Sequence, residues 1–285
     1  MGRSSALPPN RSISLPSALH PTSLRVEAEL NKLRAWEMRV CSSSETLSAQ
    51  TVQIGLVGLL EVYRCAEELV YSSCKQHGNV LENALEHTVN LLDTCGIVRD
   101  MQQKIKEQAL CLQSSFRRRG TALRFEDEIA SYLRLRKKLK KEASKCIRSL
   151  KRSERKFNVV VSLKEHHLAM VVKVLREVNV MTSRVLRFLL IFMSATGSAS
   201  KNRRGGCSLI RKLIRPKTKV EKIVNEVGSV DAALFCVLHG TEEITMADRM
   251  LENLVSSLDS IETRLDVLFR RLIRFRVSIL NVLIR

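Results

Sequence analysis

The chain has 285 residues, of which 45% are hydrophobic, and it carries a formal net charge of +19. This apolar content can supply a sizeable core, which excludes disorder throughout the chain, and the length allows one or two domains. Aromatic residues make up only 4%, which is lean for a β-sandwich or barrel. We therefore expect an all-α protein.

The positive charge is concentrated in two windows. Residues 117–156 hold 16 basic and 5 acidic side chains, and residues 201–222 hold 9 basic and 1 acidic. The rest of the chain carries 23 groups of each sign and is balanced. A surplus of this size must be neutralised by salt, a partner or a polyanionic surface.

Residues 1–23 contain serine, proline and arginine but no acidic residue. Such a segment cannot bury enough apolar surface to offset its ordering entropy, so we expect a disordered tail, with a plastid transit peptide as the alternative. Within it, Arg11, Ser12, Ser14 and Pro16 form an R-S-x-S-x-P motif. This motif resembles those bound by 14-3-3 proteins after phosphorylation of the second serine. A chance match in a serine-rich tail is the other interpretation.

Helix signals then follow one another along the chain. No proline lies between residues 22 and 215, so long helices meet no break there. The predicted helices span about 24–40, 46–76, 79–119, 123–157, 159–196 and 217–238, followed by a last helix after Gly240. Ser42 and Glu45 are placed as a capping box for the second helix. Segment 159–196 is apolar on most sides, which predicts a central helix, and residues 197–216 predict a flexible basic loop.

The last helix has the strongest periodic pattern. Twelve positions at alternating steps of three and four are apolar or alanine: Ile244, Ala247, Leu251, Leu254, Leu258, Ile261, Leu265, Leu268, Leu272, Phe275, Ile279 and Val282. A helix about 57 Å long implies an elongated antiparallel bundle. The seam fits a coiled-coil dimer or an intramolecular bundle helix, and its extra apolar width favours the second. We expect residues 24–285 to form a single helical-bundle domain, whose oligomeric state the sequence leaves open.

The helix predicted at 123–157 is apolar on one face and basic on the other. Its candidate contacts to an anionic surface are Arg134, Arg136, Lys137, Lys138, Lys140, Lys141, Lys145, Arg148, Lys151 and Arg152, continued by Arg155 and Lys156. Nucleic acid and anionic lipid are the phosphate-rich ligands that such a row can bind. Few aromatic residues interleave with it, which argues against stacking on single strands and against sequence-specific RNA recognition. Non-specific nucleic-acid binding is kept as a third alternative. A solvated face neutralised by neighbouring acidic helices is the alternative.

Sequence motifs for chemistry are missing. The chain has no G-x-S-x-G, no phosphate-binding G-x-x-x-x-G-K-[ST], no G-x-G-x-x-G and no H-E-x-x-H. We therefore expect no enzymatic activity, no cofactor and no metal site. The eight cysteines never form C-x-x-C, which favours buried small side chains in a reduced, intracellular and cytoplasmic protein. The longest apolar run, Val185 to Met193, contains Arg187 and is too short to span a membrane.

Several blocks in a fixed order carry a family resemblance. They are RSISLP at 11–16, LDTC at 92–95, RRRG at 117–120, Tyr132 with the lysines up to 141, and LFRRLIR at 268–274 followed by RVSILN at 276–281. In this order they resemble a plant-specific family related to the BYPASS proteins.

The resemblance implies a role in root and shoot development and in restraining a root-derived mobile signal. It brings no enzyme activity and no catalytic residue. We therefore expect a regulatory or adaptor protein with protein partners, among which 14-3-3 proteins and membrane-trafficking components are candidates. The alternative is a peripheral protein that binds anionic membranes through the basic helix and loop.

Overall fold

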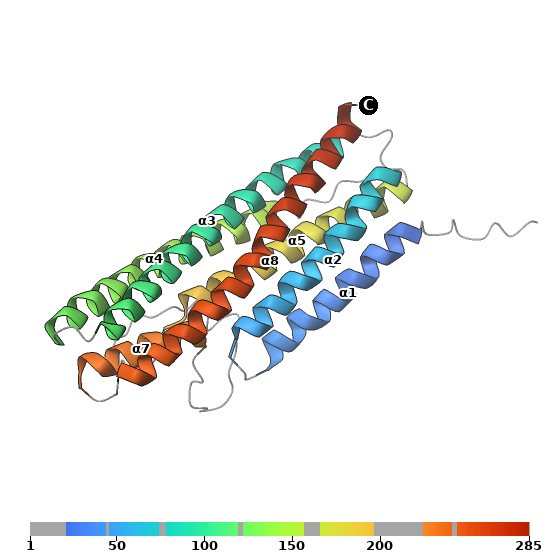
Figure 1. Ribbon diagram of the computed structural model, residues 1–285. Helices are drawn as coiled ribbons and strands as arrows, with labels where there is room; N and C mark the ends of the chain where they lie inside the picture. The colour runs from blue at the N-terminus through green and yellow to red at the C-terminus, as the bar shows by residue number, and fades with distance from the viewer. Residues whose placement is uncertain are drawn as a thin grey trace, which may run out of the picture.

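The computed structural model describes residues 21–43, 46–73, 78–118, 122–156, 166–196, 225–240 and 244–284. In these ranges it contains seven helices and no strand: α1 (Pro21–Ser42), α2 (Ala49–Ser73), α3 (Gly78–Arg117), α4 (Ala122–Lys156), α5 (His166–Ser194), α7 (Glu226–Leu238) and α8 (Ile244–Ile284). The long helices run side by side in alternating directions and form an elongated bundle (Figure 1). The predicted all-α architecture is confirmed.

The bundle is organised around α5. Helices α2 and α3 each pack against both α5 and α8, while α1 packs on α2 and α5, and α4 packs on α3 and α5. The short α7 lies at one end, where it contacts α4, α5 and α8 (Figure 1). The prediction of a central helix in the segment 159–196 is confirmed for α5, which contacts four of the other long helices.

The apolar seam of α8 faces the interior of the same chain. From Ala247 to Ile279 all ten seam positions are buried, whereas Ile244, at the first turn, is exposed. With 41 residues, α8 is about 60 Å long. The seam therefore serves packing against α2, α3 and α7, as expected for an intramolecular bundle helix.

Two helix starts differ from the sequence prediction. Residues 21–23, assigned to the tail, are the first turn of α1, where a proline is well tolerated because its missing N–H would have no helical acceptor. Helix α2 is capped by Ser48, whose hydroxyl accepts the backbone N–H of Thr51 at 3.2 Å. The capping box at Ser42 is wrong, because Ser42 is the last residue of α1.

A close approach joins α1 to α2. The indole N–H of Trp36 donates to the carbonyl of Thr51 at 3.1 Å, and the ring lies against Gly55, where a Cβ atom would stand 2.5 Å from a ring carbon. The same ring meets Phe188 of α5 edge to face, with centroids 5.3 Å apart. Glycine at position 55 therefore lets one tryptophan pack three helices together.

The cysteine prediction is confirmed only in part. Cys65, Cys95 and Cys146 are buried, and burial raises the pKa of the Cys95 thiol to about 12. Cys41 and Cys111 are exposed, so the expectation of burial is wrong for them. Across the described helices, none has the length and apolar character needed to cross a membrane.

Candidate docking surface on helix α4

The outward side of α4 carries an uninterrupted row of cations. Its members follow one another at steps of four and three residues, which places them on one line along the helix. They are Arg134, Lys138, Lys141, Lys145, Arg148 and Arg152, and all six are exposed. We call them the outer basic row. Eighteen residues separate its ends, which corresponds to about 27 Å.

The charges of this row are available to a ligand. Among the residues that the structure describes, none of the six forms an ion pair, although ion pairs between other side chains do join helices of the bundle, α4 included. Glu154 on α4, for example, pairs with Arg187 of α5 at 3.0 Å, and Arg271 on α8 pairs with Glu67 of α2 at 3.1 Å. Neutralisation of the row by neighbouring acidic helices therefore finds no support in these contacts.

Arg136 is not part of the surface, and its assignment as an anionic-surface contact is wrong. Its side chain is only 3% exposed and its Nε donates to the Asp231 carboxylate of α7 at 3.0 Å. Its two terminal nitrogens donate to the carbonyls of Met193 and Ala195 at the end of α5. The reason is its position: it lies midway between Tyr132 and Leu139, on the buried side of the helix.

Arg136 thus holds three elements at one end of the bundle. It donates to the carbonyl of Met193 in the last turn of α5, where carbonyls have no partner within the helix, and to the carbonyl of Ala195 just beyond it. It also compensates a buried carboxylate on α7. Burial nevertheless raises the pKa of Asp231, because the loss of hydration outweighs the attraction of Arg136. This cluster serves packing and leaves the orientation of α4 fixed.

The other candidates on α4 divide by exposure. Lys137 is exposed beside the outer basic row, whereas Lys140 and Lys151 are half-buried. Partial burial, aided by the positive charges of Arg187 and Arg155, lowers the pKa of Lys151. Seven of the ten predicted contacts therefore lie on the exposed surface.

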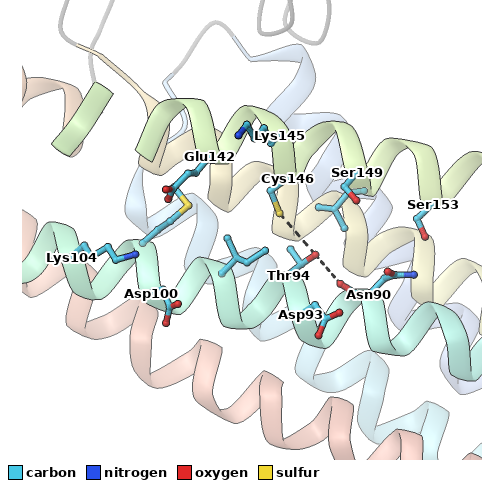
Figure 2. A pocket seen from close by; sticks show the side chains of 13 residues that line it. Asn90, Asp93, Thr94, Asp100, Lys104, Glu142, Lys145, Cys146, Ser149 and Ser153 are labelled. Carbon is cyan, nitrogen blue, oxygen red and sulfur yellow. Dashed lines mark hydrogen bonds between the residues drawn. The ribbon is translucent and has the colours of Figure 1, made fainter. Parts of the chain in front are cut away.

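An open groove runs between α3 and α4 beside this row (Figure 2). One hollow has a volume of about 500 Å³ and is lined by Asn90, Asp93, Thr94, Ile97, Asp100, Met101, Lys104, Glu142, Lys145, Cys146, Ser149, Leu150 and Ser153. A second, of about 360 Å³, is lined by Lys104, Glu107, Gln108, Ser131, Arg134, Leu135 and Lys138. Lys104 borders both, so the two hollows continue one another along the helix pair.

No sequence prediction included this groove. Its α3 side is formed by Asn90, Asp93, Ile97, Asp100 and Lys104, which follow at steps of three and four. That spacing does mark one face of a helix. The sequence could not show that this face borders α4, because no pattern within one helix determines which other helix packs beside it.

Other predicted sites lie outside the described residues. They are the motif formed by Arg11, Ser12, Ser14 and Pro16 and the second basic window at 201–222. Both remain predictions. Within the described part of the chain, no group of three His, Cys, Asp or Glu side chains is placed to hold a metal ion.

The chain was compared with models of known protein families. The family model described as Protein BPS1 matches residues 55–282. The chain belongs to the Protein BPS1 family. This confirms the resemblance seen in the sequence blocks, and the matched region includes α4 with its outer basic row and the α3–α4 groove. Neither a curated protein nor a solved structure matches the chain.

Proposed function

We propose that this member of the Protein BPS1 family is a non-enzymatic regulatory or adaptor protein that acts in root and shoot development. In this proposal the outer basic row docks onto an acidic surface of a partner protein. The observation that carries it is the row itself: six exposed cations in one line, none of them used in an ion pair within the described chain.

The physical scale supports docking through this row. An exposed ion pair contributes about 0.2 to 1 kcal/mol, so six pairs with an acidic partner supply roughly 1 to 6 kcal/mol in total. A single-sign row also steers an acidic partner during approach and speeds association at low salt. Both effects weaken as ionic strength rises, because the exposed charges are screened.

Binding to an anionic membrane is the second candidate function. A straight row of about 27 Å can lie flat on a bilayer, and each Lys or Arg near an anionic leaflet contributes about 1 kcal/mol. Sedimentation with liposomes that contain or lack acidic lipid tests this candidate. Binding that is absent, or that does not depend on salt, would remove it.

The variant K141E/R148E/R152E tests the docking role, because it reverses the row at three exposed positions. We expect this variant to fold with unchanged stability and to fail to restore root and shoot growth in a loss-of-function plant line. The matched control R249E/R270E/R274E changes the same net charge at exposed positions of α8 and should restore growth. Full restoration by K141E/R148E/R152E would contradict the proposal.

The partner is sought by affinity purification from plant tissue with both variants in parallel. We propose 14-3-3 proteins and membrane-trafficking components as partners to score first. Loss of a partner with K141E/R148E/R152E, but not with the α8 control, assigns that partner to the outer basic row. A 14-3-3 protein that binds through the tail should instead be lost with Ser14→Ala.

A further inference from the structure

We propose that the groove between α3 and α4 is the docking site for an amphipathic helix of a partner protein. One edge of that helix is acidic and faces α4, and its other edge is basic and faces α3. This inference rests on the proposed function and deepens it, because it names the kind of partner element that lies next to the outer basic row.

The dimensions of the groove fit a helix. The two hollows extend along α3 from Asn90 to Gln108, which corresponds to about 27 Å or five helical turns. Their floor is apolar, with Met101 and Leu150 buried beneath the opening. Ile97 borders the same opening and is 42% exposed. A helix bound in a groove uses such contacts as anchors for side chains spaced three and four residues apart.

The two edges of the groove have opposite charge. On α3, Asp93, Asp100 and Glu107 form an exposed acidic edge at steps of seven residues. On α4, Arg134, Lys138 and Lys145 form a basic edge. Figure 2 shows Asp93 and Asp100 on one helix and Lys145 on the other.

The opposite edges do not neutralise each other. Within the described ranges no ion pair connects α3 to α4, although α3 pairs with α8 through Lys106 and Asp259 and through Arg99 and Asp266, at 3.0 Å. The groove keeps the edges apart, so both remain free to pair with a ligand that fills the space between them.

Where the two hollows meet, the signs of the charges on the two helices are exchanged. Lys104 stands on the α3 side and Glu142 on the α4 side. A matching partner helix is therefore neutral at its centre and charged toward its ends.

The acidic edge decides between a helix and a membrane. An anionic bilayer that covered the groove would bring like charge against Asp93, Asp100 and Glu107, which is unfavourable. A helix with two edges of opposite sign meets an opposite charge on both sides. Wrong partners, which carry one sign on both edges, are repelled on one side.

Three synthetic 18-residue helical peptides serve as probes for the full-length protein. They share a leucine stripe and a neutral centre, and their edges carry Glu and Lys on opposite sides, Glu on both sides, or Lys on both sides. We expect the mixed peptide to bind at least about fivefold more tightly than either of the others in fluorescence anisotropy at low salt. Equal affinity of the mixed and the all-Glu peptide would overturn the proposal.

Charge reversal of each edge should change the ranking of the peptides. With D93K/D100K the all-Glu peptide becomes the tightest ligand, and with K138E/K145E the all-Lys peptide does. The control E27K/E252K adds the same charge as D93K/D100K on α1 and α8 and should keep the mixed peptide first. A ranking that none of the edge variants alters would refute the groove as the docking site.

Two further outcomes separate this proposal from the proposed function. If K141E/R148E/R152E fails in plants while the peptide ranking ignores D93K/D100K, the row docks a partner and the groove proposal is wrong. If charge reversal of the edges changes the peptide ranking while K141E/R148E/R152E restores growth, the groove proposal is supported and the docking role of the outer basic row is wrong. Displacement of the mixed peptide by phosphatidylserine vesicles would assign the face to a membrane and also overturn the helix proposal.

Discussion

Replacing Arg136 with methionine tests how the end of the bundle is held together. The change R136M keeps an unbranched side chain but removes the charge that compensates Asp231 and the donors to the carbonyls of Met193 and Ala195. Removal of one partner from a buried ion pair costs about 3 to 5 kcal/mol, because the other charge stays buried without compensation. We expect the free energy of unfolding to fall by this amount near neutral pH.

The loss should depend on pH. The pKa of Asp231 lies above its ordinary value of 3.8 because burial penalises the charged carboxylate. When an acid has a higher pKa in the folded than in the unfolded state, stability falls as pH rises between the two values, since the unfolded state loses its proton first. Without Arg136 the folded-state pKa rises further. The deficit of R136M should therefore shrink as pH is lowered from neutral toward 5, because Asp231 becomes protonated in the variant.

Urea unfolding followed by far-ultraviolet circular dichroism, at neutral pH and at pH 5, measures how much stability R136M has lost. The exposed neighbour Lys137 supplies the control K137M, which should change the free energy of unfolding by less than about 0.5 kcal/mol. The double variant R136M/D231N removes both charges and should recover part of the loss. A deficit as small as that of K137M, or one that is equal at both pH values, would refute the reasoning.

Three further predictions concern other parts of the bundle. Gly55→Ala should lower the free energy of unfolding by about 1 to 3 kcal/mol in thermal melts, because the added methyl group would overlap the Trp36 ring. The control Gly58→Ala meets only the flexible end of a leucine side chain and should change the free energy of unfolding by less than about 1 kcal/mol. Equal effects of the two substitutions would contradict this prediction. Burial lowers the pKa of His87 below 6.5, so the unfolded state takes up a proton before the folded state as pH falls. The protein should therefore lose stability below pH 6.5, and His87→Gln should make the free energy of unfolding in urea less dependent on pH in that range. An unchanged pH dependence in His87→Gln would contradict this prediction. Residues 199–215 lie within the segment that the sequence predicts as a flexible loop; their replacement by a short Gly/Ser linker should change the free energy of unfolding by less than about 1 kcal/mol, and a larger loss would contradict that prediction.

Helix order and the central position of α5 could be predicted from the sequence because both depend on local signals. No proline lies between residues 22 and 215, Gly240 follows the end of α7, and the apolar periodicity of α8 is unbroken over its buried seam. These features are properties of single segments, and the structure confirms them. The start of α2 was misplaced because Ser42 and Ser48 both stand before an apolar run, and only packing decides which serine caps the helix.

The candidate site was predicted less completely. Seven lysines and arginines of α4 were correctly placed on the exposed surface. When the apolar face of a helix packs on the core, the charged residues on its opposite face are left in contact with solvent. Arg136 was misassigned, although the apolar face shows a step of seven residues from Tyr132 to Leu139, and Arg136 lies on that face between the two. Its partner Asp231 is 95 residues away in the chain, and no local pattern links the two.

The central position of α5 has a consequence for synthesis of the chain. Helices α1 to α4 precede α5 in the sequence and all pack against it. Their inward apolar faces therefore stay incomplete until about residue 194 has left the ribosome, and exposed faces of this kind favour aggregation of incomplete chains. A nascent chain that stops before α5 should need chaperone protection, and the faces of α2 and α3 that pack against α8 stay open until that last helix has also been made.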